Sequence, residues 1–218
     1  MLVCVGVASC SDEKSHGMHP GLIPRQSAEY WLPGRAPITT LFPDGFRFTA
    51  SPTLIGLHYL LEMKSPPLPP PEDARVCTAT GVLVIFTDHI KPDGSPSISY
   101  PISMPCERYH EAVDRIDYLT EFGKFRRNCM DGTPATFERI RGAEISYFDD
   151  GNTCAASDPS MAISGLLQPL LREYGPKDVI PSRPDWYPDD NAAFPPAIQR
   201  LYDLDKARQG ADHNQTVQ

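Results

Sequence analysis

The sequence predicts a single, disulfide-stapled α+β domain, in which an antiparallel sheet carries two to three helices, behind a flexible N-terminal stalk. The chain has 218 residues, which is the length of one domain with a tail. Five alternating or apolar runs indicate strands, and three stretches have a helical period. Proline occurs 24 times, well above its usual share, and this excludes a helix bundle or a coiled coil.

Strands are expected where apolar, β-branched residues are bounded by turn residues. The predicted strands are 46–50, 53–63, 75–87, 97–103 and 137–148. Gly81 would mark a bulge in the third strand. The third and fourth strands would form a hairpin around Lys91-Pro92-Asp93-Gly94, and Asp149–Asn152 would be a turn that closes the last strand.

Helices are expected over 107–122, over 159–175 and over 196–207, because apolar residues recur there at helical spacing. Asp158 resembles an N-cap before Pro159, and Pro169 would kink the second helix. We expect a stalk over 10–37, a globular domain over 38–209 and a disordered tail over 210–218. Tyr30, Trp31 and Leu32 would mark the point where the stalk meets the domain.

The first nine residues are uncharged and mostly apolar, and the chain then becomes polar. A helix of nine residues would span about 14 Å, too little to cross a bilayer. Val7-Ala8-Ser9-Cys10 resembles the lipobox of bacterial lipoproteins. The resemblance implies that 1–9 is a signal-peptide remnant, that Cys10 is lipidated, and that the protein is periplasmic and anchored to the outer membrane. The alternative is a buried N-terminal strand with Cys10 as a core cysteine.

The cysteine count favours the same compartment. Without Cys4 and Cys10, four of the six cysteines remain, and an even number in an oxidising compartment indicates two disulfides. Cys77 and Cys106 lie almost symmetrically about the predicted hairpin turn and should pair, which leaves Cys129 to pair with Cys154. The alternative is four free thiols in a cytosolic fold.

The sequence carries no catalytic signature, so we expect no enzyme, no cofactor and no metal site. His16 and His19 have a metal-like spacing but fall in the predicted stalk. The net charge of −8 should repel nucleic acid and anionic lipid, so the membrane would be reached only through the lipid anchor.

One segment has the composition of a protein-binding loop. Its large aromatics and acids lie between prolines, and the candidate partner-binding residues are Asp185, Trp186, Tyr187, Asp189 and Asp190. Aromatic residues with a polar group are common anchors at interfaces, and acidic residues steer a basic partner. The alternative is that Trp186 and Tyr187 pack inward and pin the loop to the core.

The general layout, a lipobox followed by an acidic domain, resembles the immunity lipoproteins of type VI secretion systems. The resemblance implies a protein that binds a secreted antibacterial toxin, such as a phospholipase, an amidase or a metallopeptidase, and occludes its active site. Two alternatives remain open: a structural or assembly lipoprotein of the cell envelope, and an extracytoplasmic hydrolase whose site is assembled from scattered residues.

Overall fold

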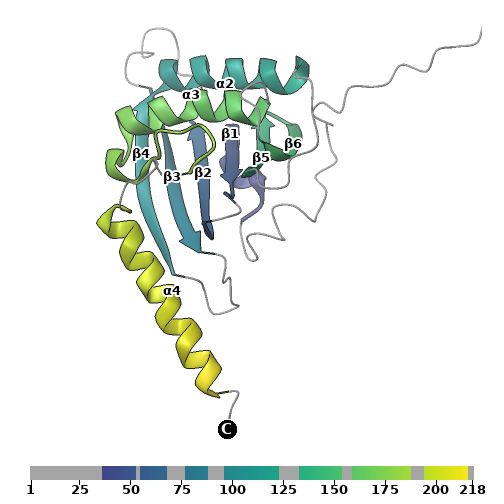
Figure 1. Cartoon of the computed structure of the whole chain (residues 1–218). Coiled ribbons are helices and arrows are strands. Elements are labelled where there is room, and N and C mark those ends of the chain that lie inside the picture. Colours follow the sequence, from purple (N-terminus) through teal and green to yellow (C-terminus); the bar gives the residue numbers. More distant parts are fainter. Residues whose placement is uncertain are drawn as a thin grey trace, which may run out of the picture.

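The computed structural model describes residues 36–52, 55–67, 77–87, 96–122, 133–153, 159–187 and 194–215. It confirms the α+β class. Six strands form one antiparallel sheet in the order β4-β3-β2-β1-β5-β6, and α2 and α3 lie together on one face of it (Figure 1). We call this the inner face of the sheet, and the opposite side the outer face.

The elements follow the chain in a simple order. The strands are β1 (Asp44–Ala50), β2 (Leu57–Ser65), β3 (Thr78–Thr87), β4 (Ser97–Pro105), β5 (Thr133–Arg141) and β6 (Glu144–Thr153). The helices are α2 (Cys106–Phe122), α3 (Pro159–Tyr174) and α4 (Pro196–Gln215), with short 3-10 turns η1 (Ile38–Leu41) and η3 (Lys177–Val179). The strand predictions for β1 to β4 and the three helix predictions are therefore confirmed, with shifted ends.

Where the sequence predicted one strand over 137–148, the structure has the hairpin β5–β6. The strands turn at Gly142 and Ala143, between the paired residues Arg141 and Glu144. Gly142 has φ +58°, a conformation that glycine adopts at low cost. The predicted turn at 149–152 lies inside β6, so that prediction is wrong.

Gly81 is not at a bulge. β3 pairs through it in regular register, with Met63 on one side and Ile102 on the other. A Cβ atom at this position would lie 2.1 Å from the Glu62 carbonyl oxygen and 2.3 Å from Met63 Sδ. Glycine is therefore needed because β2 approaches closely, which a sequence pattern does not distinguish from a bulge.

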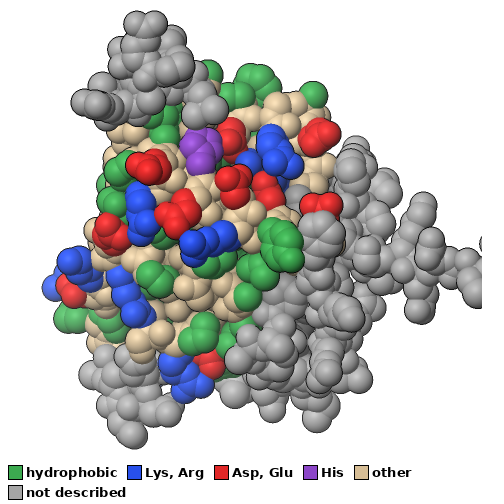
Figure 2. Space-filling model, turned by 90° about the horizontal axis from the view of Figure 1, so that it is seen from above, with side chains coloured by type: hydrophobic (Ala, Val, Ile, Leu, Met, Phe, Trp, Pro, Cys, Tyr) green, Lys and Arg blue, Asp and Glu red, His purple; other side chains and the backbone are tan. Residues whose placement is uncertain are grey.

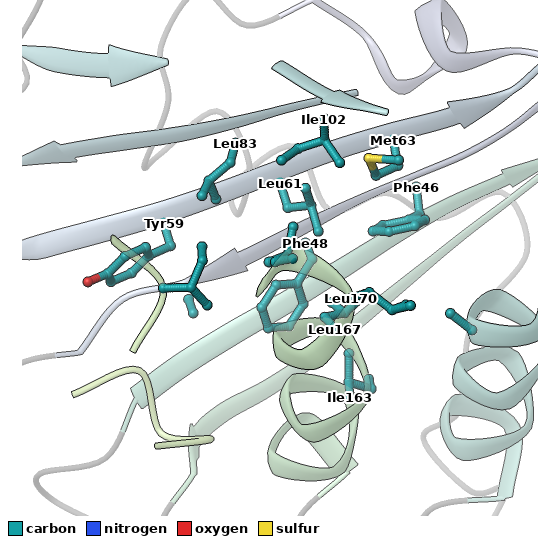
Figure 3. Packing of buried hydrophobic residues seen from close by; sticks show 14 of the residues in the cluster. Phe46, Phe48, Tyr59, Leu61, Met63, Leu83, Ile102, Ile163, Leu167 and Leu170 are labelled. Carbon is teal, nitrogen blue, oxygen red and sulfur yellow. The ribbon is translucent and has the colours of Figure 1, made fainter. Parts of the chain in front are cut away.

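The main core lies between the inner face and the helices (Figure 3). Alternate residues of β1 and β2, among them Phe46, Phe48 and Leu61, point toward α3, which contributes Ile163 and Leu167. Tyr109, Val113 and Ile116 bring the apolar side of α2 to the same core. The side chains that alternate with these residues along β1 and β2 point to the outer face.

The outer face combines polar and apolar side chains. Arg47 is 3% exposed and lies between two carboxylates, with Nε 2.7 Å from Glu62 Oε1 and Nη1 2.6 Å from Glu138 Oε2. Beside this group, Leu60, Val84 and Phe86 form a small buried apolar cluster. η1 packs on Ile140 of β5, also on the outer face but on the other side of β1 from this apolar cluster.

α4 leaves the sheet near β3 and β4 and projects beyond its lower end (Figure 1). Ile198 and Leu201 belong to the main core, whereas Leu204 is 58% exposed. The helix continues to Gln215, beyond the predicted end at Ala207, so the prediction of a disordered tail from 210 is wrong for 210–215. Lys206, Ala207, Arg208 and Gln209 are good helix formers, which favours continuation past that point.

Two glycines form a matched test of this packing. We expect Gly81→Ala to lower the free energy of unfolding by about 1–3 kcal/mol, because the new Cβ collides with backbone of β2. Gly165→Ala should raise it by roughly 0.5–1 kcal/mol, because Gly165 lies within α3 and a Cβ there meets nothing within 4 Å. Urea denaturation measures both, and a neutral Gly81→Ala would contradict the observed β2–β3 register.

Candidate functional site

Trp186, in the predicted binding loop, is a core residue and not an exposed anchor, and its packing fixes the loop to the domain. Its side chain is 1% exposed and packs against Phe48 and Tyr59, with ring centroids 5.7 and 4.8 Å away. The indole N–H donates a hydrogen bond to Ser164 Oγ at 2.8 Å. The assignment of Trp186 to a partner-binding surface is therefore wrong, and the alternative, a residue that pins the loop to the core, is confirmed.

The other predicted binding residues divide into two groups. Asp185 accepts two hydrogen bonds from Arg183, at 2.7 and 3.1 Å, and its backbone oxygen accepts one from Thr133. Tyr187 is half-buried, with the Arg183 guanidinium 5.9 Å from its ring centroid. Asp189 and Asp190 lie outside the described residues. The described part of the loop is thus held by contacts with its own chain.

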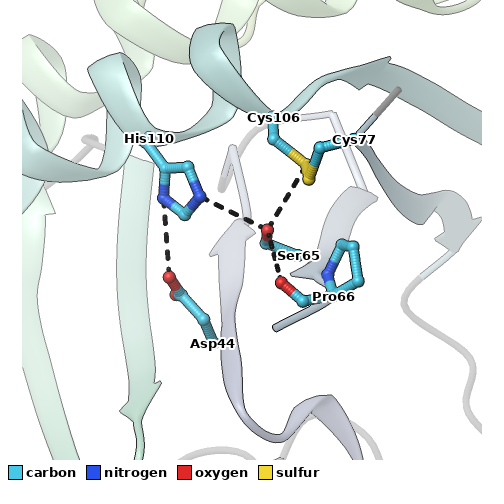
Figure 4. Close-up of a disulfide and its surroundings, with 6 residues drawn as sticks. All are labelled: Asp44, Ser65, Pro66, Cys77, Cys106 and His110. Carbon is cyan, nitrogen blue, oxygen red and sulfur yellow. Dashed lines mark hydrogen bonds and ion pairs between the residues drawn. A yellow bond between two sulfur atoms is a disulfide. The ribbon is translucent and has the colours of Figure 1, made fainter. Parts of the chain in front are cut away.

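A different group of functional side chains meets where β1 begins and β2 ends (Figure 4). Asp44 and Ser65 are cross-strand partners in the β1–β2 ladder, and His110 reaches them from α2. His110 Nε2 lies 3.4 Å from Ser65 Oγ, and His110 Nδ1 lies 3.6 Å from Asp44 Oδ2. The order serine, imidazole, carboxylate is the one used in nucleophilic catalysis.

Ser65 is the most enclosed member of this group, at 1% exposed. Its hydroxyl also lies 3.1 Å from the Pro66 carbonyl oxygen and 3.6 Å from Cys106 Sγ. A hydroxyl has one proton, so donation to Pro66 and donation to His110 exclude each other. In the observed geometry the Ser65 hydroxyl lies between the end of β2 and the start of α2. Catalysis would need this hydroxyl to donate its proton to the His110 imidazole instead of to Pro66.

Asp44 also connects this group to buried charges on the inner face. The Arg139 guanidinium, 3% exposed, pairs with Asp44 at 2.5 Å and with Asp117 at 3.3 Å. Tyr109 donates a hydrogen bond to Asp44 at 3.1 Å, and burial raises the pKa of this phenol well above its usual range. Burial likewise raises the pKa of the Asp117 carboxyl, an effect that Arg139 and Arg141 oppose. Figure 2 shows acidic and basic side chains intermingled on the face of the molecule that carries α2.

The disulfide Cys77–Cys106 lies beside this group, as predicted from the hairpin. It extends the β3–β4 ladder by one position, because Thr78 pairs with Pro105. Cys106 also begins α2, and its backbone N–H donates to the Cys77 carbonyl oxygen at 3.1 Å. The bridge therefore fixes the start of α2, one turn before His110, to the sheet. Cys10, Cys129 and Cys154 lie outside the described residues.

The predictions from the sequence did not include Asp44, Ser65 or His110. No local spacing could have indicated them, because 21 and 45 positions separate them along the chain. They meet only through the register of β1 with β2 and through the docking of α2.

Comparison with known proteins gives no identification: no family model, curated protein or solved structure matches the chain. Within the part of the chain that the structure describes, no three metal-ligating side chains gather. None of the described helices is long and apolar enough to cross a membrane.

Proposed function

We propose that the protein is an exported, lipid-anchored immunity protein, which binds a cognate secreted antibacterial toxin and occludes its active site. The observation that carries this proposal is the Cys77–Cys106 disulfide, which joins two elements of the fold. Structural disulfides persist in oxidising compartments such as the periplasm and are rare in the cytosol. The Val7-Ala8-Ser9-Cys10 pattern supports the same compartment.

The outward side of α2 is the surface we propose for the partner, now that Trp186 is known to be buried. Five of its exposed residues, four acids and a tyrosine, follow each other at intervals of four and three, which places them in one row along the helix: Glu107, Glu111, Asp114, Tyr118 and Glu121. Arg115 is exposed beside this row and forms an ion pair with Glu111 at 3.0 Å. Tyr118 is 64% exposed, among the most exposed large hydrophobic residues described. An exposed tyrosine among acids fits a partner whose contact surface is basic around an apolar pocket.

The proposal is tested by competition between siblings. A strain that lacks the gene should lose viability when it is grown in contact with its toxin-secreting parent, and a copy of the gene should restore survival. Tyr118→Ala should weaken binding by about tenfold, roughly 1.4 kcal/mol, and so protect less well at low expression. Leu204→Ala is the matched control, because it removes an exposed side chain far along α4. Equal survival of the deletion strain and its parent would exclude an immunity function.

A hydrolase is the second candidate function, and the Asp44–His110–Ser65 arrangement favours it. In this reaction His110 takes the hydroxyl proton as Ser65 Oγ bonds to the acyl carbon of an ester, and passes it to the leaving alkoxide; water then releases the acid by the reverse steps. A fluorophosphonate probe should bond to Ser65 with loss of fluoride, and His110→Ala should abolish the labelling. Labelling of Ser103, an exposed serine on β4, would be non-specific. Absence of labelling at Ser65 would exclude it as the nucleophile and contradict this second candidate function.

A further inference from the structure

We propose that the Cys77–Cys106 disulfide is a site of thiol–disulfide exchange with a low-molecular-mass thiol, which bonds to Cys77 and releases Cys106 as a thiolate. The exchange itself depends on this chain alone. Its consequence for partner binding, given below, rests on the proposed function. Figure 4 shows the residues that carry the argument.

The exchange is a substitution at sulfur. A thiolate attacks Cys77 Sγ, the S–S bond breaks, and its electron pair leaves on Cys106 Sγ. The products are a mixed disulfide on Cys77 and a thiolate on Cys106, so one thiolate is consumed and one is formed. The rate of such a step depends on access to the attacked sulfur and on the stability of the departing thiolate. Both conditions distinguish the two cysteines.

Access favours attack at Cys77. This residue directly precedes β3 and is partly exposed, whereas Cys106 is 4% exposed and belongs to the main core. A small thiol reaches a partly exposed cysteine more readily than one that the core encloses. The cysteine on the core side is therefore the leaving group.

The start of α2 favours Cys106 as the departing thiolate. Cys106 is the first residue of this helix, and the N–H groups of a first helical turn have no acceptor within the helix. Pro105 precedes it, and proline has no side-chain acceptor that could cap these groups. A helix N-terminus stabilises the thiolate of a cysteine placed there, because the positive end of the helix dipole faces the negative sulfur.

A buried hydroxyl supplies a second, independent stabilisation. Ser65 Oγ lies 3.6 Å from Cys106 Sγ and 3.1 Å from the Pro66 carbonyl oxygen, and Ser65 is 1% exposed. A disulfide sulfur is a weak acceptor, so the Pro66 oxygen competes well for the hydroxyl proton while the bridge is closed. A thiolate is a charged acceptor and attracts that proton more strongly. The sulfur therefore gains a hydrogen bond from Ser65 when the bridge opens.

His110 supports this hydrogen bond. It lies one turn after Cys106 on α2, and its Nε2 is 3.4 Å from Ser65 Oγ. Donation from His110 Nε2 to Ser65 Oγ leaves the hydroxyl proton for the sulfur, and hydrogen bonds in such a chain strengthen one another. The carboxylate of Glu107 opposes a neighbouring thiolate, but Glu107 is exposed and its charge is screened.

Opening the bridge would release the start of α2 from the sheet. The disulfide and the hydrogen bond from the Cys106 N–H to the Cys77 carbonyl oxygen connect the helix to the chain before β3. α2 also carries Glu107 and Tyr118, which belong to the surface we propose for the toxin. Partner binding would therefore weaken when a thiol opens the bridge. It would recover when the Cys106 thiolate displaces that thiol from Cys77.

The test is exchange of the native full chain with reduced glutathione as the probe thiol, under conditions in which circular dichroism shows a folded protein. Acid stops the exchange, and peptic peptides are mapped by mass spectrometry without reduction. We expect the first glutathione adduct on Cys77, with Cys106 as a free thiol. Adducts mainly on Cys106, equal adducts on both cysteines as in an unfolded chain, or a bridge that glutathione does not open would overturn the proposal.

Ser65→Ala tests the contribution of the hydroxyl. We expect the peptide that links Cys77 to Cys106 to disappear about three- to tenfold more slowly than in the parent, because the departing thiolate loses its donor. Ser103→Ala is the matched control and should leave the rate unchanged, since Ser103 is an exposed serine on β4. Equal or faster opening in Ser65→Ala would contradict the assigned role.

Two features keep these measurements decisive. Ser65→Thr retains a hydroxyl and should restore most of the parent's rate, and the adduct map of the parent requires no variant to fold. Neither measurement involves lipidation or a toxin, so the exchange can fail while the immunity proposal stands, and the reverse also holds.

Discussion

Trp186→Ala should lower the free energy of unfolding by about 3–5 kcal/mol. The substitution removes a side chain that is 1% exposed and packs on Phe48 and Tyr59, and it leaves a cavity in the main core. It also leaves Ser164 Oγ without the indole donor, which lies 2.8 Å away. The midpoint of urea denaturation, followed by circular dichroism, measures the change.

A conservative variant separates the contributions of the Trp186 ring and its hydrogen bond, and a variant of the neighbouring residue is the control. Trp186→Phe keeps most of the ring but loses the hydrogen bond, so we expect a loss of roughly 1–3 kcal/mol. Tyr187→Ala removes the half-buried neighbour and should cost about 1 kcal/mol or less. If Trp186→Ala is folded and as stable as the parent, the residue is not a core residue and the binding-loop hypothesis returns.

Arg47→Met should be comparably destabilising, at about 3–5 kcal/mol. Arg47 is the cation between Glu62 and Glu138, whose side chains are 16% and 3% exposed. Removing it leaves buried carboxylates without their charged partner, which costs more than the ion pair itself contributes. Arg115→Met is the control, because its ion pair with Glu111 is exposed and should change stability by about 0.5 kcal/mol or less.

The loss in Arg47→Met should depend on pH. Burial raises the pKa of the Glu138 carboxyl, and Arg47 opposes this effect, so the pKa should rise further in the variant. A carboxyl with a higher pKa in the folded state binds its proton more tightly there than in the unfolded chain. The destabilisation is therefore greatest at pH values above the folded-state pKa of Glu138. It is relieved as the pH falls from there toward the pKa of the same carboxyl in the unfolded chain. Denaturation at several pH values measures this, and a pH-independent loss would contradict it.

The sequence predicted the fold class and most of the elements, because local signals are strong there. Alternation indicated β1, apolar character β2, and a β-branched run with its hairpin turn β3 and β4; helical periodicity indicated α2, α3 and the start of α4. The β5–β6 hairpin was missed because its turn consists of Gly142 and Ala143 within a continuous strand-like run. Gly81 was misinterpreted because a close approach of two strands and a bulge leave the same residue in the sequence.

The candidate site was less predictable for a physical reason. The Cys77–Cys106 bridge followed from hairpin symmetry, which is a local property of the chain. Asp44, Ser65 and His110 come together only through strand register and helix docking, which no spacing encodes. At Trp186 a local pattern was present but misleading. An aromatic residue among acids has the composition of an interface anchor. The same residue is equally suited to burial when its N–H finds a partner in the core, as it does at Ser164.

The proposed lipid anchor and exported compartment are tested by mass spectrometry of the native protein from its own cells, after membrane fractionation and without reduction. We predict a protein in the membrane fraction whose first residue is Cys10, with the mass of attached lipid. We also predict a peptide in which Cys77 is linked to Cys106, and a second in which Cys129 is linked to Cys154. A chain from the soluble fraction with residues 1–9 intact and with Cys77 and Cys106 open to alkylation would contradict both the anchor and the compartment.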